Sequence, residues 1–249
     1  VPTDRELPPA DMENILRRAD CRFVFYNPSI EDKIDAIRPH LPHVERYIRM
    51  GTSAADWATD LENIARRGAE LVRTGDNSYY DYNIDPDRLA SIVFTSGTTG
   101  SGKGVMLSQR NIGSDMTQGM YNFLISEKTM FVLPPHHTYG STVNLVGHFS
   151  QGCEIYISSG VRYLLNEMKE QKPTHLILVP LFVETLYKKI WQIAEKNGKA
   201  VLLKKALAFS NGMRKIGIDI RRTLFKDVLN AFGGRLQMII CGGAALSQE

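Results

Sequence analysis

The spacing of apolar and polar residues changes repeatedly along the chain. Met12, Ile15 and Leu16 stand at helical spacing among charged residues, whereas the run over 21–26 is mostly apolar and typical of a buried strand. Helix and strand patterns that alternate in this way predict an α/β fold, with a largely parallel sheet flanked by helices. Further helices are predicted over 29–38, 54–73, 108–126, 141–149, 161–170 and 181–197, and further strands over 44–50, 91–94, 105–107, 129–133, 153–157, 175–179 and 236–241.

Composition and charge narrow the function classes. The 249 residues are enough for one large or two ordinary domains. The net charge of +3, from 30 basic and 27 acidic residues, is too balanced to predict a nucleic-acid partner. Three scattered cysteines, Cys21, Cys153 and Cys241, favour reduced core thiols over disulfides or a metal site. No apolar run reaches the roughly 18 residues of a spanning helix and no signal-peptide pattern is present, so a soluble, cytoplasmic protein is expected.

A loop rich in glycines and hydroxyls lies between two short apolar runs. The stretch from Ser91 to Ser108 reads SIVFTSGTTGSGKGVMLS. Glycines let a backbone turn through positive φ and expose its N–H groups, while hydroxyls and an ammonium add donors with little bulk. This combination suits a polyphosphate. The candidate phosphate-binding residues are Thr95, Ser96, Gly97, Thr98, Thr99, Gly100 and Lys103.

Two nucleotide-binding loops fit this composition. Gly97 to Lys103 spells the G-x-x-x-x-G-K of a P-loop, but Gly104 stands where that motif needs a hydroxyl for magnesium. A P-loop lysine also opens a helix, whereas residues 105–107 have a strand pattern and Ser108 fits the N-cap of the next helix. The pattern therefore favours a loop between two strands. A flexible glycine hairpin without a ligand is the remaining alternative.

The loop resembles the phosphate loop of the adenylate-forming family, which includes acyl-CoA synthetases, luciferases and peptide-synthetase adenylation domains. In that family it reads T-S-G-T-T-G-x-x-K-G, and Thr95 to Gly104 match every fixed letter. The resemblance implies that the loop amides, its hydroxyls and Lys103 hold the β- and γ-phosphates of ATP.

Two adjacent histidines follow a predicted strand. Two prolines end that strand and place His136 and His137 at its carboxyl end, where open α/β sheets keep their ligand sites. Residue type alone does not separate a site from an ordinary loop. Acyl-CoA synthetases carry L-P-x-x-H-x-x-G here, and Leu133, Pro134, His137 and Gly140 match it. The resemblance makes His137 the candidate catalytic residue, beside the substrate carboxylate; a metal site at the histidine pair is not expected.

The C-terminal part adds a basic segment and a glycine loop. The segment from Lys199 to Lys226 fits either a solvated helix face, which is the favoured interpretation, or peripheral association with an anionic membrane. A predicted strand then ends in Gly242, Gly243 and Ala244, where small residues let a flat ring approach the backbone. This stretch resembles bacterial long-chain acyl-CoA synthetases, which implies that these three residues contact the adenylate. His175, at the start of another strand, is predicted to be a packed core histidine.

The resemblance covers all 249 residues but only the middle of the family's large N-terminal domain. It implies first helix and strand units over 1–90, a phosphate loop and acyl and adenylate pocket over 91–249, and an absent C-terminal domain. The implied function is ATP-dependent activation of a fatty acid and its transfer to CoA, with ATP, Mg²⁺ and CoA as cofactors. Because the family's adenine, magnesium and catalytic lysine motifs would lie beyond Glu249, the isolated chain is expected to be inactive and prone to self-association. The alternatives are a P-loop hydrolase with an altered magnesium ligand and a nucleotide-binding pseudo-enzyme.

Overall fold

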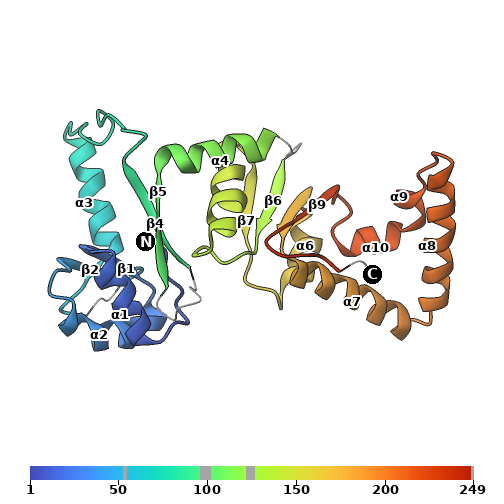
Figure 1. Cartoon of the computed structure of the whole chain (residues 1–249), viewed down its shortest axis with the longest axis horizontal. Coiled ribbons are helices and arrows are strands. Elements are labelled where there is room, and N and C mark those ends of the chain that lie inside the picture. The colour runs from blue at the N-terminus through green and yellow to red at the C-terminus, as the bar shows by residue number, and fades with distance from the viewer. Residues whose placement is uncertain (53–54, 96–101, 122–126, 248–249) are drawn as a thin grey trace. The chain divides into compact units, whose positions relative to one another are not determined.

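The chain folds into two compact units, Val1–Gly113 and Ser114–Glu249. Figure 1 labels their helices and strands. The structure is a computed structural model, and it describes residues 1–52, 55–95, 102–121 and 127–247. No helix in these ranges is long and apolar enough to cross a membrane.

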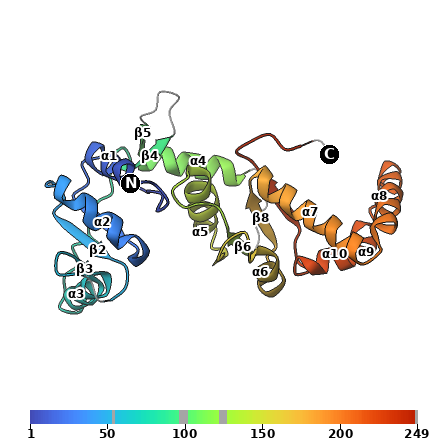
Figure 2. The ribbon, with the colours of Figure 1, turned by 90° about the horizontal axis from the view of Figure 1, so that it is seen from below.

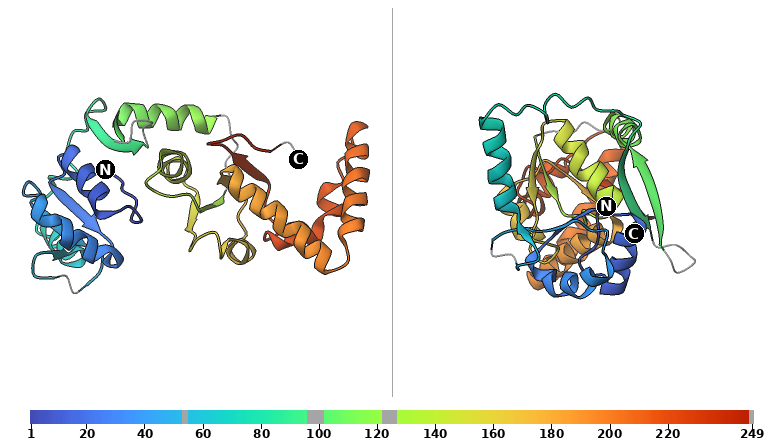
Figure 3. Two further views of the ribbon diagram at one scale, coloured as in Figure 1. Left: turned by 60° about the horizontal axis from the view of Figure 1, so that its bottom comes forward. Right: turned by 90° about the vertical axis from the view of Figure 1, so that its left-hand side faces the viewer.

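The first unit combines a small parallel sheet with an antiparallel hairpin. Strands β1, β2 and β3 pair in that order and in parallel, with Val24 opposite Tyr47. Strands β4 and β5 form the hairpin, whose two strands run side by side in opposite directions (Figure 3). The elements are α1 (Pro9–Arg18), β1 (Phe23–Tyr26), η1 (Pro28–Ile30), α2 (Glu31–Ile37), η2 (Arg38–His40), β2 (Arg46–Arg49), β3 (Thr59–Asp60), α3 (Leu61–Arg73), β4 (Leu89–Thr95) and β5 (Lys103–Ser108).

The core of the first unit forms where α1 and α2 pack on β1 and β2. Met12 and Leu16 lie one turn apart on α1, so both face the sheet, as the helical spacing of the sequence predicts. The ring of Trp57 stacks on Tyr26 at 5.8 Å and meets the edge of Tyr47 at 5.7 Å. The buried side chains of this core are Met12, Leu16, Val24, Tyr26, Ile34, Ile37, Leu41 and Tyr47.

The second unit is built on two parallel strand pairs, β6 with β7 and β8 with β9. The two pairs lie edge to edge. Where β6 and β8 begin, the N–H of Thr174 donates to the carbonyl of Lys128 at 2.9 Å. Every residue of β8 is buried, as expected of a central strand covered on both faces. The elements are α4 (Gln109–Tyr121), which begins in the first unit, β6 (Lys128–Phe131), η3 (Tyr139–Gly147), α5 (His148–Ser150), β7 (Glu154–Ile157), α6 (Leu164–Gln171), β8 (His175–Leu178), α7 (Pro180–Lys196), α8 (Ala200–Lys215), α9 (Arg221–Leu224), α10 (Lys226–Ala231) and β9 (Met238–Cys241).

Most predicted elements are confirmed, and the α/β class with them. The helix predicted from residue 54 is wrong at its start: α3 begins at Leu61, because Thr59 and Asp60 pair with β2 as an extra strand. His175 is a core residue, 1% exposed, and its ring stacks on that of His148 at 4.8 Å. All three cysteines are free and half-buried.

Candidate functional site

The phosphate loop connects the two strands of the β4–β5 hairpin. Thr95 ends β4 and stands opposite Lys103, which begins β5, and the Thr95 hydroxyl donates to the Lys103 carbonyl at 3.5 Å. A lysine that opens a strand does not fit a P-loop, whose lysine opens a helix. The P-loop alternative is therefore not favoured. The predicted donors Ser96, Gly97, Thr98, Thr99 and Gly100 lie outside the described residues.

Glycines allow the two strands to approach closely at the loop exit. A Cβ at Gly102 would lie 2.9 Å from the Thr95 carbonyl oxygen, and one at Gly104 would lie 3.1 Å from Cγ2 of Ile92. Both distances are shorter than an ordinary van der Waals contact, so a larger residue would push the strands apart. The glycines thus fix the position of Lys103, whose side chain is exposed.

Arg18 of α1 supports the same loop exit, and the sequence did not predict this. Its Nη1 donates to the Gly102 carbonyl at 2.5 Å, and its guanidinium lies 5.3 Å from the ring centroid of Phe94. The contact provides a cation–π interaction and a second positive charge beside the loop. No local pattern marks Arg18, because the interaction joins residues 84 positions apart.

The end of the hairpin is held by two further interactions. Arg110 binds Asp87 through both guanidinium nitrogens, at 2.6 and 2.9 Å, and these bonds lower the pKa of the Asp87 carboxyl. Ser108 caps α4 as predicted: its hydroxyl accepts from the Asn111 N–H at 3.1 Å, and its own N–H donates to the Asn111 side chain at 2.9 Å. These bonds hold the end of β5 against the first turn of α4.

In the second unit, His137 lies on a tight turn after β6. Its backbone N–H donates to the Pro134 carbonyl at 3.2 Å, and its Nδ1 accepts from the Tyr139 N–H at 3.3 Å. Since a backbone N–H can only donate, Nδ1 carries no proton and the neutral ring has its proton on Nε2. The exposed ring thus presents an N–H donor, which suits a carboxylate oxygen.

Gly140 permits this turn. A Cβ at this position would lie 2.4 Å from the Pro134 carbonyl oxygen and 3.2 Å from the Leu133 Cβ. The first turn of η3 therefore rests directly on Leu133 and Pro134, which follow β6 after Val132. Packing explains the spacing between the proline and the glycine of this motif without any ligand.

Tyr139 connects this turn to the glycine loop after β9. A Cβ at Gly242 would lie 2.7 Å from the Tyr139 hydroxyl, and Gly243, at φ +83°, would place one 4.0 Å from the same ring. The Gly242 N–H donates to the Leu178 carbonyl at 3.1 Å, which holds the loop against β8. Burial raises the pKa of Tyr139, so the hydroxyl stays protonated at neutral pH and can donate.

The structure thus brings some predicted residues together. His137, Gly242 and Gly243 gather around Tyr139 in the second unit, with Ala244 exposed next in the loop. Lys103 and Thr95 belong to the first unit. Tyr139 itself was not predicted, because only the contact with Gly242 distinguishes it from an ordinary loop tyrosine. In the described part of the chain no three His, Cys, Asp or Glu side chains cluster as a metal site would require.

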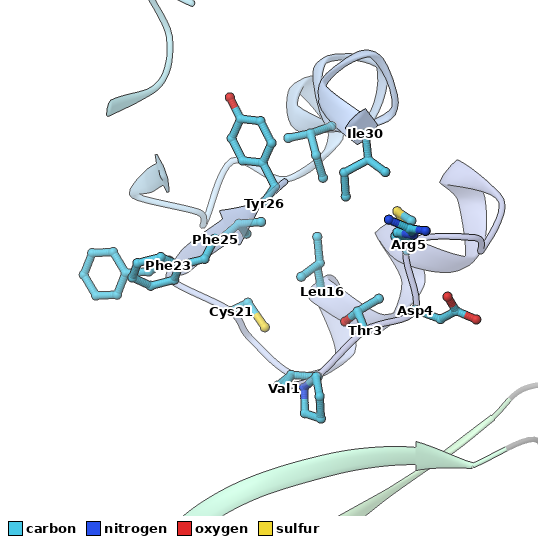
Figure 4. A pocket seen from close by; sticks show the side chains of 14 residues that line it. Val1, Thr3, Asp4, Arg5, Leu16, Cys21, Phe23, Phe25, Tyr26 and Ile30 are labelled. Atoms are coloured by element: carbon cyan, nitrogen blue, oxygen red, sulfur yellow. The ribbon is translucent and has the colours of Figure 1, made fainter. Parts of the chain in front are cut away.

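A cavity of about 290 Å³ lies under the N-terminal arm of the first unit. Figure 4 shows Leu16, Cys21 and Ile30 around it, with Val1 and Thr3 on the arm. Burial raises the pKa of the Cys21 thiol, so it remains protonated at neutral pH and is a poor nucleophile.

The comparisons with known proteins agree with this geometry. A family model described as AMP-binding enzyme matches residues 1–249. Probable acyl-activating enzyme 16, chloroplastic, of Arabidopsis thaliana is 34% identical over 158 residues, which cover 59% of this chain and 22% of that protein. Long-chain-fatty-acid–CoA ligase 1 of Homo sapiens is 31% identical over 174 residues, which cover 65% of this chain and 25% of that protein. The chain therefore spans about a quarter of the length of these curated relatives.

Solved structures show the same fold. The inhibitor-bound N-terminal domain of FACL13 from Mycobacterium tuberculosis matches with a TM-score of 0.67, over 99% of this chain and 51% of that one. At 17% sequence identity this likeness concerns the fold alone.

Proposed function

The chain belongs to the family of AMP-binding enzymes, and from this premise we propose that it takes part in the ATP-dependent ligation of a fatty acid to CoA. The observation that carries the proposal is the hairpin, in which Lys103 begins β5 directly opposite Thr95. This pairing puts Thr95 and Lys103 at the same end of the hairpin, where a polyphosphate would bind. The similarity to long-chain-fatty-acid–CoA ligases supports a fatty acid as the acid substrate.

In the proposed reaction the fatty-acid carboxylate attacks the α-phosphorus of ATP. An oxygen–phosphorus bond forms to give acyl-adenylate, and the bond to pyrophosphate breaks. The sulfur of CoA then attacks the acyl carbon, and AMP leaves. Little covalent chemistry falls to the protein, which positions the reactants and stabilises phosphate charge.

We assign the roles as follows. Lys103 and the loop from Thr95 to Gly100 would hold the β- and γ-phosphates, and magnesium would arrive bound to the nucleotide. The N–H on Nε2 of His137 would donate to the substrate carboxylate, and Gly242, Gly243 and Ala244 would lie against the adenylate. Tyr139 would position both loops. We also propose a cytoplasmic location, which the three free cysteines support.

The proposal is tested by pyrophosphate exchange in the full-length protein, with MgATP and a series of fatty acids. We expect exchange that depends on the fatty acid, followed by acyl-CoA formation when CoA is added. Nucleotide binding without exchange would instead support the pseudo-enzyme alternative. Exchange with amino acids or aromatic acids but not with fatty acids would agree with the family assignment, but it would show that the acid substrate is not a fatty acid.

Replacing His137 by alanine tests the assignment of the carboxylate donor. A hydrogen bond to a charged group contributes about 1.5–3 kcal/mol, so we expect the KM for fatty acid to rise by about tenfold to a hundredfold and the KM for ATP to change little. His136→Ala is the matched control, because it removes the neighbouring ring from the same turn. A larger defect in His136→Ala would show that the motif has been placed one residue out of register.

A further inference from the structure

Two buried histidine rings lie against each other in the second unit. His148, on α5, and His175, on β8, stack with their centroids 4.8 Å apart and their planes inclined by 17°. Their exposed fractions are 0% and 1%. The nitrogens of stacked rings lie in nearly parallel planes and do not converge on one point, so the arrangement does not fit a metal ion. We call His148 and His175 the histidine pair.

Hydrogen bonding fixes where His148 carries its proton. Its Nδ1 lies 2.6 Å from the carbonyl oxygen of Asn144, and a carbonyl can only accept, so Nδ1 holds the proton. Nε2 is then a bare acceptor. It is buried, and none of the residues that the structure describes donates a hydrogen bond to it. Further protonation of His148 would therefore create a buried N–H⁺ at Nε2 with no acceptor, which costs more than protonation of an exposed ring.

The described residues around the histidine pair offer no charge that would compensate such a proton. Burial lowers the pKa of His148, and its hydrogen bonds to two backbone carbonyls oppose this only in part. The Cys153 thiol follows α5 and stays neutral, because burial raises its pKa. On the adjoining strands, Glu154 of β7 is exposed and pairs with Lys128 of β6 at 2.7 Å. Among the described residues, no carboxylate contributes to the pKa of His148.

The histidine pair holds one end of a helix whose other end begins at the turn of His137. Helix η3 continues directly into α5, and Figure 2 shows this helix beside β6 and β8 in the second unit. At its first turn the Ser141 N–H donates to the His137 carbonyl at 2.9 Å. Near its end, Gly147 lies against the flexible side chains of Met116 and Met120 on α4. Loss of the contact at the histidine pair would therefore free the end of η3 from the sheet.

We propose that the histidine pair makes the contact between α5 and β8 sensitive to acid, so that proton uptake at mildly acidic pH releases the η3–α5 helix from β8. While the helix is in place, the rings are neutral. Once released into water, they take up protons with the ordinary histidine pKa of about 6.5. The released form then binds more protons than the packed form, so the contact is at full strength above that pH and weakens as the pH falls below it. The proposal depends on neither ATP nor the acid substrate.

Amide hydrogen exchange in the full-length protein, without ligands, tests this directly. Exchange rates at pH 7.5 and 5.5 are divided by the intrinsic rate at each pH, which gives the equilibrium constant for opening. A histidine that is neutral when packed and titrates at about 6.5 when released raises this constant about tenfold over the interval. We therefore expect a rise of about tenfold to a hundredfold over residues 139–150, including the Ser141 amide beside His137. An opening constant that is the same at both pH values would overturn the proposal.

His148→Phe removes the titrating nitrogens and keeps a flat aromatic ring in the stack. The rise in the opening constant between pH 7.5 and 5.5 should be about tenfold smaller than in wild type. His40→Phe is the matched control: the same substitution replaces a histidine of the first unit whose side chain is 61% exposed, and it should leave the rise over residues 139–150 unchanged. An equal reduction in His40→Phe would contradict the proposal, because the effect would not then be specific to the histidine pair.

His148→Gln separates titration from packing. Glutamine is neutral at both pH values, but it differs from phenylalanine in shape and keeps a polar head. It should reduce the rise in the opening constant by the same factor as phenylalanine, even where it lowers stability at pH 7.5. If only one of the two variants lost the pH dependence, packing rather than a proton on His148 would be responsible. A pH dependence that persisted in both variants would refute the role of His148.

Discussion

Replacing Lys103 by alanine in the full-length protein is expected to lower the rate of acyl-adenylate formation by about two to three powers of ten. The lysine begins β5 opposite Thr95, and glycines on either side of it fix the backbone there. Under the proposed function its ammonium would stabilise the charge on the leaving pyrophosphate. The measurement is pyrophosphate exchange at saturating ATP and fatty acid.

A binding experiment separates this role from a general defect. An acyl-sulfamoyl-adenosine has no β- or γ-phosphate, so its dissociation constant should be nearly the same for wild type and Lys103→Ala. Lys169→Ala, an exposed site on α6, controls for the loss of a positive charge. If Lys103→Ala weakened binding of ATP and of the analogue equally, the lysine would contact another part of the ligand or affect folding.

Features with a local cause could be predicted from the sequence. The β4–β5 hairpin follows from two apolar runs around a loop of glycines and hydroxyls, and the cap at Ser108 follows from its position before α4. The buried strand β8 follows from its continuous apolar pattern. Each of these depends on residues a few positions apart, where propensity and periodicity are informative.

Features that depend on distant contacts could not be predicted in this way. Arg18 reaches Gly102 across 84 positions, and Tyr139 and Gly242, which lie close together, are 103 positions apart. The predicted start of α3 was wrong for the same reason, because Thr59 and Asp60 become a strand only through pairing with β2. Helix α8 shows a related limit: its composition was visible, but which apolar residues stay exposed depends on packing against its neighbours.

The turn that holds His137 should be sensitive to a single methyl group. In Gly140→Ala the new Cβ would lie 2.4 Å from the Pro134 carbonyl oxygen, a backbone atom that cannot rotate away, so η3 or the turn has to shift. Overpacking of this kind costs about 1–3 kcal/mol. The melting temperature measured by circular dichroism should fall by about 2–4 °C for each kcal/mol lost.

Gly212→Ala is the matched control for this prediction. Gly212 lies inside α8, and an added Cβ there would meet no atom within 4 Å. Because alanine restricts the unfolded chain and favours helix, this variant should be more stable than wild type, by up to about 1 kcal/mol. Both substitutions add one methyl group to a glycine. The close approach to Pro134 is therefore what should make Gly140→Ala lower the melting temperature while Gly212→Ala raises it. A Gly140→Ala protein that melts at or above the wild-type temperature would show that the turn is looser than the structure indicates, and that His137 is not fixed by it.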